Sequence, residues 1–165
     1  MDISQITDYL FVGAQPSVEH AEELRALGVR LIISMRGEKR PPGRFLQPPF
    51  RTLWLPTYDT FLTPIPLRTL ITGVETALPE IDGGGRVLIH CQRGRHRSVA
   101  MAAAILIARG HTSEAAMQLI LARRPEADPY LWYIRQRIVM FEKRWRDVMR
   151  VAPHGDASQP KGQSR

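Results

Sequence analysis

The 165-residue sequence predicts an α/β protein with a mainly parallel sheet covered by helices. Strand-like segments alternate with helix-like segments along most of the chain, and this alternation is typical of parallel strands joined by crossover helices. The clearest strand, residues 86–90, leads through a short loop into the apolar helical segment 98–109. The length and the 44% apolar content fit one globular domain, which we expect to span residues 1–150.

Four short segments have the composition of strands. Each is a run of aliphatic, aromatic or β-branched residues bounded by turn-forming residues, and these runs are residues 9–12, 29–34, 51–55 and 86–90. The segments 36–49 and 56–64 are rich in proline, glycine and polar residues, so they are expected to be loops.

Five further segments are predicted to be helical from the residues that begin and end them. They are residues 17–27, 66–78, 98–109, 113–124 and 128–149. Ser17 and Ser113 can cap the first and fourth of these helices through their hydroxyl oxygens. Pro66 and Pro129 suit the entry to the second and the last, because proline has no N–H that the first turn would leave unpaired.

The chain is basic. It has 23 lysine and arginine residues against 16 aspartate and glutamate residues, a formal net charge of +7, with an isoelectric point of about 10.3. This excess favours anionic partners, namely nucleic acids, membrane surfaces or phosphorylated substrates. Because the sequence has no nucleic-acid-binding motif and no run of aromatic residues interleaved with basic ones, no nucleic acid partner is expected.

The sequence indicates neither a secretion signal nor a membrane-spanning segment. The N-terminus lacks a basic stretch followed by an apolar one, and the longest apolar run, residues 99–108, is about half of the roughly twenty residues that a spanning helix needs. We therefore expect a cytoplasmic protein, for which a peripheral membrane contact stays open. Residues 151–165 offer little to bury, and we expect this tail to be disordered.

The single cysteine, Cys91, begins a loop between the clearest strand and an apolar helix. The segment reads His90-Cys91-Gln92-Arg93-Gly94-Arg95-His96-Arg97-Ser98. A short loop into a helix N-terminus turns successive backbone N–H groups toward one point, and the helix dipole adds to this attraction for anions. Gly94 can take a backbone angle that other residues avoid, and Arg97 can hold two phosphate oxygens with its guanidinium. Residues 92–97 are therefore predicted to cradle a phosphate.

The same surroundings predict a reactive thiolate at Cys91. Inward N–H groups, a helix N-terminus and nearby cations lower the pKa of a thiol, so the sulfur is poised to attack a phosphate bound above it. Ser98 could donate a hydrogen bond to the sulfur and help it leave a phosphocysteine, and His90 could fix the loop through its ring nitrogens. A buried structural cysteine would explain Cys91 alone, but not the four basic residues in the loop. With one cysteine, the chain can form neither an intramolecular disulfide nor a metal site of several thiolates.

This segment resembles the His-Cys-x2-Gly-x2-Arg-Ser signature of the cysteine-dependent protein tyrosine phosphatase superfamily at every specified position. The chain is most similar to the dual-specificity phosphatases, over about residues 6–145. Segment 6–13 resembles their opening strand, and Arg124-Pro125 with the final helix resembles their C-terminal part. The resemblance implies a central, mainly parallel sheet with helices on both sides. It also implies hydrolysis of phosphotyrosine, phosphoserine and phosphothreonine proteins through a phosphocysteine, without a metal or cofactor.

A general acid is also needed, because an alkoxide or phenoxide departs poorly without a proton. Asp59 lies in the loop directly after strand 51–55, and loops that follow parallel strands gather at one edge of a sheet. Its position, 32 residues before Cys91, also resembles that of the family's general acid. Asp82 and Asp128 are weaker candidates, since the first adjoins a glycine turn at the far end of the last strand and the second precedes a proline as a helix cap.

Basic residues around the loop leave the substrate class open. Arg93 is expected to point to solvent. Arg95 resembles a basic residue that lipid-directed members of the superfamily carry, among them phosphatidylglycerophosphate and phosphoinositide phosphatases, whereas Gln92 departs from their usual lysine. An anionic phospholipid is therefore the alternative to a phosphorylated protein.

The final helix is basic as well. Phe141, Trp145 and Met149 recur every four residues, which predicts a core-facing apolar stripe beneath a solvated basic face. Docking of this face to an anionic membrane is the alternative interpretation. The basic residues are Arg135, Arg137, Lys143, Arg144, Arg146 and Arg150.

Two other classes of protein could use such a loop. One is a phosphate-binding pseudophosphatase module without turnover, against which the intact set of Cys91, Arg97 and Asp59 argues. The other is a sulfur-transfer enzyme of the rhodanese kind, and the Arg97-Ser98 helix start together with the upstream acid favours a phosphatase over it. An RNA 5′-triphosphate would also suit the chemistry of so positive a pocket.

Overall fold

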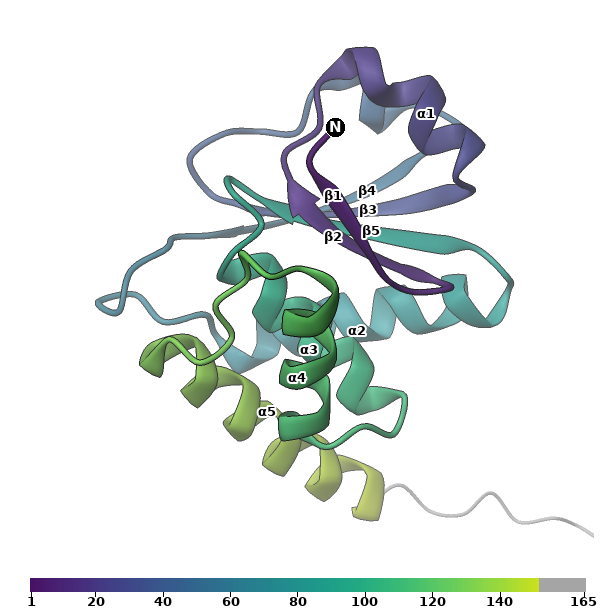
Figure 1. The fold of residues 1–165 in the computed structure, drawn as a ribbon. Helices are drawn as coiled ribbons and strands as arrows, with labels where there is room; N and C mark the ends of the chain where they lie inside the picture. Colours follow the sequence, from purple (N-terminus) through teal and green to yellow (C-terminus); the bar gives the residue numbers. More distant parts are fainter. Residues whose placement is uncertain (152–165) are drawn as a thin grey trace, which may run out of the picture.

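The computed structural model describes residues 1–151 and contains one five-stranded sheet (Figure 1). The strands lie in the order β1-β2-β5-β3-β4. Strand β1 pairs antiparallel with β2, and the three other pairs are parallel, which confirms the prediction of a mainly parallel sheet. The strands are β1 Ile3–Thr7, β2 Leu10–Ala14, β3 Val29–Arg36, β4 Arg51–Thr57 and β5 Arg86–Cys91.

The described residues also form five α-helices and two short 3-10 helices. The α-helices are α1 Ala21–Ala26, α2 Leu67–Asp82, α3 Arg97–Ala108, α4 Ser113–Arg123 and α5 Trp132–Val151, and the 3-10 helices are η1 Val18–His20 and η2 Gly43–Leu46. Helix α1 lies on one face of the sheet, and α2 to α5 gather on the other (Figure 1). Helices therefore flank both sides, as the resemblance implied.

Each strand supplies both layers of the core, because successive side chains point to opposite faces. In β5, Val87 and Ile89 join the large cluster under α2 to α5, whereas Leu88 packs with Leu24 of α1 and with Phe45. Helix α3 is buried along almost its whole length, which explains why its sequence is apolar on all sides. The helix that follows the predicted phosphate loop is thus fixed in the centre of the molecule.

One strand and several helix ends differ from the sequence predictions. Strand β1 was not predicted, because only Ile6 among its five residues is buried and its sequence does not alternate. Helix α2 continues past Pro79 to Asp82, where Ile81 packs into the core and the Gly83 N–H bonds the Pro79 carbonyl.

The helix caps are also shifted. Thr112, not Ser113, caps α4, since its hydroxyl accepts the Ala115 N–H at 3.1 Å. Ser17 accepts the Glu19 N–H as expected, but it caps the short η1 turn that precedes α1. Helix α5 begins at Trp132 instead of residue 128, because the preceding residues form a turn whose Leu131 N–H bonds the Asp128 carboxylate.

The predicted apolar stripe of helix α5 is confirmed at Phe141 and Trp145 but not at Met149. Ile138 and Phe141 are buried and Trp145 stacks on Phe141, but Met149 is 60% exposed, so the stripe ends before it. The helix includes Val151, the first residue of the tail expected to be disordered, and residues 152–165 lie outside the described residues. Within residues 1–151, no helix combines the length and the apolar character that a bilayer crossing demands.

Candidate active site

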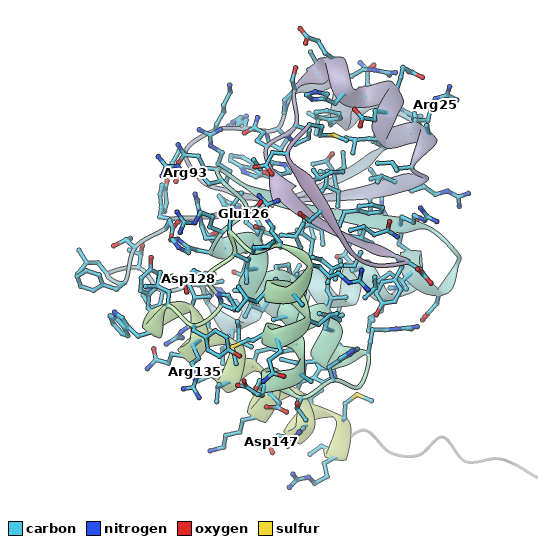
Figure 2. All side chains as sticks on the ribbon, in the orientation of Figure 1. Arg25, Arg93, Glu126, Asp128, Arg135 and Asp147 are labelled. Atoms are coloured by element: carbon cyan, nitrogen blue, oxygen red, sulfur yellow. The ribbon has the colours of Figure 1, made fainter. Side chains whose placement is uncertain are left out.

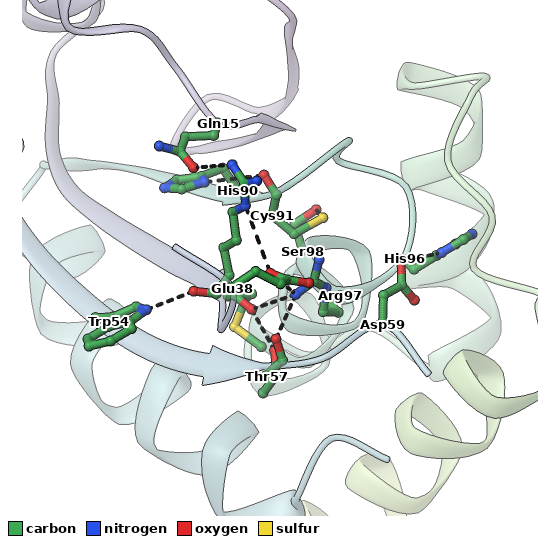
Figure 3. Close-up of polar contacts among 12 residues, drawn as sticks. Gln15, Glu38, Trp54, Thr57, Asp59, His90, Cys91, His96, Arg97 and Ser98 are labelled. Atoms are coloured by element: carbon green, nitrogen blue, oxygen red, sulfur yellow. Dashed lines mark hydrogen bonds and ion pairs between the residues drawn. The ribbon is translucent and has the colours of Figure 1, made fainter. Parts of the chain in front are cut away.

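The carboxyl ends of the parallel strands meet at one edge of the sheet, and the predicted site lies there (Figure 3). Ala14 of β2 pairs in register with Cys91 of β5, and Ser34 of β3 pairs with His90. Arg36 of β3 stands opposite Thr57 of β4. The loops that leave these strands therefore open on the same side, which brings the predicted nucleophile and the predicted acid together.

The loop of residues 91–97, called the cradle loop below, wraps around the Cys91 sulfur. The sulfur accepts the Gly94 N–H at 3.3 Å and lies 3.3 Å from the Ser98 hydroxyl oxygen. Gly94 has a φ of +66°, and a Cβ there would come within 2.4 Å of the Gly13 backbone. Glycine is thus required both for the backbone angle and for the close approach of β2.

Cys91 is buried, yet its surroundings favour the thiolate. Burial raises the pKa of the Cys91 thiol, whereas hydrogen bonds from Ser98, the charge of Arg97 and the Arg93 N–H lower it. The lowering effects outweigh burial, so the pKa lies below that of an ordinary thiol. The surroundings of Cys91 therefore favour its thiolate form more than those of an ordinary buried thiol do.

His90 is buried beside the cradle loop, and its imidazole is neutral. Burial and the charge of Arg36 lower the pKa of His90 to about 4, although a hydrogen bond to the Cys91 carbonyl opposes them. Its Nδ1 lies 3.4 Å from that carbonyl oxygen. Because a carbonyl can only accept, Nδ1 carries the proton. The ring thus contacts the cradle loop at its first residue, as the sequence suggested.

Arg97 lies at the start of α3, but its guanidinium is held differently from the expected fork over the cradle. Its Nη1 donates to the Thr57 carbonyl at 2.6 Å and to the Glu38 carboxylate at 3.0 Å (Figure 3). The side chain is 1% exposed, and within residues 1–151 its buried Nε has no hydrogen-bond partner. Leaving a buried donor unpaired costs free energy, so the Nε–H is suited to donate a hydrogen bond to an oxygen of a bound anion.

Asp59 follows β4 and faces the cradle loop. One carboxylate oxygen lies 2.8 Å from His96 Nδ1, and the other accepts the Tyr133 hydroxyl at 2.9 Å. Burial raises the pKa of the Asp59 carboxyl, but His96, the Tyr133 hydroxyl and the charge of Arg97 lower it by more, so the net pKa lies below the ordinary value. These contacts therefore favour the ionised form of the carboxyl.

A pocket of about 170 Å³ brings most of the predicted residues together. The residues that line it are Asp59, Cys91, Gln92, Arg93, Arg95 and His96. The two weaker acid candidates do not line it: Asp82 bonds Arg109, and Asp128 bonds the Leu131 N–H in the turn before α5.

The two remaining arginines of the cradle loop are exposed at the pocket. Arg93 is exposed, as expected, and also lines the pocket. Arg95 donates from Nε to the Glu126 carbonyl at 2.9 Å, and its own carbonyl accepts the Asp128 N–H. Arg93, Glu126 and Asp128 lie on the same side of the molecule, whereas Asp147 lies at the far end of α5 (Figure 2). The basic C-terminal half of α5 is thus remote from this pocket.

The sequence did not predict the role of Arg124, which bonds the outward-facing carbonyls of the cradle loop. Arg124 is completely buried and donates to the carbonyls of Arg93 and Gly94 at 3.1 and 2.8 Å. It also bonds both carboxylate oxygens of Asp2, and its Nη1 reaches the Ser4 hydroxyl. With the carbonyls held outward in this way, the loop can turn N–H groups toward the sulfur.

Three other contacts of the site were also missed, and none had a local signal. They are the Thr57 carbonyl, Glu38 and Tyr133, which reach Arg97 or Asp59 across 40 to 74 residues of sequence. The Arg124-Pro125 pair resembles the C-terminal part of the family, but nothing in the sequence indicated which residues Arg124 contacts.

The fold and this site define a class of protein, and the comparison with known families agrees. The model of the dual specificity phosphatase catalytic domain matches residues 10–143. The chain therefore belongs to the dual specificity phosphatase family. It is similar to mouse dual specificity phosphatase 28, with 28% identity over 138 residues that cover 81% of this chain and 80% of the mouse protein.

Solved structures share the fold. The crystal structure of human DUSP28 superposes with a TM-score of 0.78 at 23% identity, covering 88% of this chain and 96% of that one. The crystal structure of PTPMT1 in complex with PI(5)P gives a TM-score of 0.80 at 24% identity, covering 89% and 98% of the two chains. At these identities the likeness establishes the common architecture.

Proposed function

We propose that the protein is a metal-independent phosphomonoesterase that works through a phosphocysteine on Cys91. One observation carries this proposal: a buried thiol whose pKa is lowered shares a pocket with Asp59 and is influenced by the charge of Arg97. A thiolate, a fixed cation and a carboxyl group are the nucleophile, the charge stabiliser and the proton donor that such hydrolysis needs. His90 supports the loop, and Ser98 supports the thiolate.

In the first step the Cys91 thiolate attacks phosphorus. The S–P bond forms as the P–O bond to the leaving group breaks, and the leaving oxygen takes a proton from the Asp59 carboxyl. Backbone N–H groups from Gln92 to Arg97, with the guanidinium of Arg97, stabilise the charge on the other phosphate oxygens. A bound phosphate dianion adds negative charge near Asp59, which raises the pKa of its carboxyl and favours the protonated form.

In the second step water attacks the phosphocysteine. The Asp59 carboxylate takes a proton from the water as the new P–O bond forms, the S–P bond breaks and its electron pair returns to the sulfur. The Ser98 hydroxyl, 3.3 Å from that sulfur, donates to the departing thiolate. Inorganic phosphate then leaves, and Asp59 again holds the proton for the next cycle.

We propose phosphotyrosine, phosphoserine and phosphothreonine side chains of proteins as the substrates. Membership of the dual specificity phosphatase family supports this substrate class. A chain whose only cysteine must stay a free thiol is suited to a reducing compartment, which supports a cytoplasmic location.

An anionic phospholipid is the second candidate substrate, and one surface favours it. Four exposed apolar side chains lie within three residues of Asp59 or next to Tyr133 in the sequence, and Phe61 and Trp132 contact each other: they are Tyr58, Phe61, Leu62 and Trp132. Aromatic side chains beside arginines are typical of surfaces that contact the membrane interface, and Arg93 and Arg95 lie in the adjoining pocket. PTPMT1, which shares the fold, has been crystallised in complex with PI(5)P.

The experiment is phosphate release in the presence of a chelator, with a phosphotyrosine peptide and with phosphatidylglycerophosphate in mixed micelles. We expect vanadate-sensitive turnover that Cys91→Ser abolishes and that Asp59→Asn lowers by roughly 10²- to 10⁴-fold. Faster turnover of the peptide supports the protein substrate, and faster turnover of the lipid supports the second candidate. Phosphate binding without turnover would make the protein a binding module, and undiminished activity of Cys91→Ser would refute the mechanism.

A further inference from the structure

Both carboxylate oxygens of Asp59 are engaged by side chains from elsewhere in the fold. His96 Nδ1, from the cradle loop, lies 2.8 Å from Oδ2 (Figure 3). The Tyr133 hydroxyl, from the first turn of α5, donates to Oδ1 at 2.9 Å. Three segments that are far apart in sequence therefore converge on one carboxyl group.

The loop that carries Asp59 has little else to hold the carboxyl in place. Residues 58–64, called the acid loop below, are irregular, and its Phe61 and Leu62 side chains are exposed. A tilted ring contact between Phe61 and Trp132, with centroids 6.0 Å apart, joins the loop to the start of α5. The direction of the Asp59 side chain thus depends on His96 and Tyr133.

His96 occupies a position where a side chain ordinarily caps the helix. It is the N-cap residue of α3, and N-cap side chains usually accept N–H groups of the first turn. Within residues 1–151 the His96 ring makes no such capping bond and turns to Asp59 instead. The imidazole therefore bonds the Asp59 carboxyl group instead of capping the helix.

Tyr133 is suited to be a permanent donor. Burial and the bond to Asp59 raise the pKa of Tyr133 to about 12, so its hydroxyl keeps its proton at any working pH. Its ring lies edge-on to the His96 ring, with centroids 6.5 Å apart. The two donors to Asp59 thus support each other's orientation.

We propose that His96 and Tyr133 are positioning residues for the general acid, which fix the Asp59 carboxyl toward the pocket above Cys91. The proposal rests on the proposed function and adds to it the two groups that orient the proton donor. They act through Asp59, whose proton goes to the leaving oxygen as the P–O bond breaks. Their removal should therefore matter most for substrates whose leaving group needs that proton.

The test compares two substrates that differ in how much their leaving group needs a proton from Asp59. Phenyl phosphate releases a strongly basic phenoxide, whereas para-nitrophenyl phosphate releases a stabilised anion. In Tyr133→Phe and in His96→Ala, we expect the ratio of kcat for phenyl phosphate to kcat for para-nitrophenyl phosphate to fall by roughly 10- to 100-fold, the scale of a misplaced reacting group. His96→Asn, whose amide can replace the Nδ1 donor, should restore part of the ratio.

The chain offers a matched control in Tyr130, three residues before Tyr133. Its hydroxyl also donates to a carboxylate, that of Glu114 at 2.7 Å, but outside the pocket. Tyr130→Phe should leave the ratio unchanged. Thermal unfolding of all variants shows whether any of them is merely less stable.

A double-substitution cycle makes the result decisive. In an Asp59→Asn background, Tyr133→Phe should lower kcat for phenyl phosphate by no more than about twofold, because groups that act through one residue are not additive. Equal losses on both substrates, or full additivity with Asp59→Asn, would overturn the proposal. If the wild-type protein hydrolyses neither substrate, the proposed function itself has failed, and the two failures are thereby distinguished.

Discussion

Ser98 is the residue that most directly controls the Cys91 thiol, since its hydroxyl oxygen lies 3.3 Å from the sulfur. Both its hydroxyl and its backbone lower the pKa of that thiol, but only the hydroxyl is lost on truncation. Hydrogen bonds to charged groups contribute about 1.5–3 kcal/mol, so Ser98→Ala should raise the pKa of Cys91 and lower the fraction of thiolate at neutral pH.

The rate of iodoacetamide alkylation as a function of pH measures this shift, because only the thiolate reacts. Ser113→Ala, at the start of α4, is the control for loss of a buried serine outside the site. An unchanged alkylation midpoint in Ser98→Ala would show that the hydroxyl does not stabilise the thiolate.

At the same scale, the site shows what one sequence can predict about single residues. The spacing within segment 90–98 was sufficient to predict the cradle loop, because a loop and its following helix are local structure. Asp59 was predicted from its place after a strand, and the structure puts it in the same pocket as Cys91. The groups that orient these residues were not predictable, because contacts such as Tyr133 to Asp59 depend on how distant elements pack.

At the scale of elements, Arg124 joins the end of α4 to β1 and to the cradle loop. Its guanidinium is completely buried and bonds Asp2, Ser4 and the carbonyls of Arg93 and Gly94. Lysine cannot form this fork of donors. We expect Arg124→Lys to lower the free energy of unfolding by about 3 kcal/mol, the low end for breaking a buried charged network, and to weaken vanadate binding as well.

Urea unfolding and vanadate inhibition measure the two effects. Arg123→Lys is the matched control, since Arg123 is the neighbouring residue of the same helix and is exposed. Equal behaviour of the two variants would mean that the cradle loop keeps its shape without Arg124.

Elements were predicted well where burial imposes a periodic sequence and poorly elsewhere. All four parallel strands and all five α-helices were expected near their observed positions, the strands from their apolar runs and the helices from the residues that begin and end them. Strand β1 was missed because its pairing with β2 is made by the backbone and leaves little trace in the side chains. The cap of α4 was misplaced because Thr112 and Ser113 are equivalent caps by composition, and only the structure selects Thr112. The start of α5 was misplaced because Asp128 closes a turn before the helix.

At the scale of the whole molecule, His90 makes folding depend on pH. Its pKa is about 4 in the folded protein, whereas that of an unperturbed histidine is about 6.5, so the unfolded chain binds more protons between these pH values. The contribution of neutral His90 to the free energy of unfolding is therefore fully present above pH 6.5 and is lost as the pH falls toward 4. At about 1.4 kcal/mol per unit, this group accounts for a loss of about 3 kcal/mol.

Urea unfolding of the wild type and of His90→Asn at both ends of that pH window tests this. We expect the variant to be less stable at neutral pH but to lose about 3 kcal/mol less across the window. Parallel curves for the two proteins would assign the acid sensitivity to other groups.

The order of the sheet has a consequence for how the chain is assembled. Strand β5 lies between β2 and β3, which precede it in sequence and do not pair with each other. Until Arg86–Cys91 leaves the ribosome, the nascent chain can form only two separate pairs, β1 with β2 and β3 with β4. Insertion of β5 joins them, and such non-local pairing is slow. The strand that completes the sheet is also the one that ends in Cys91, so the thiol enters the fold only with the last strand.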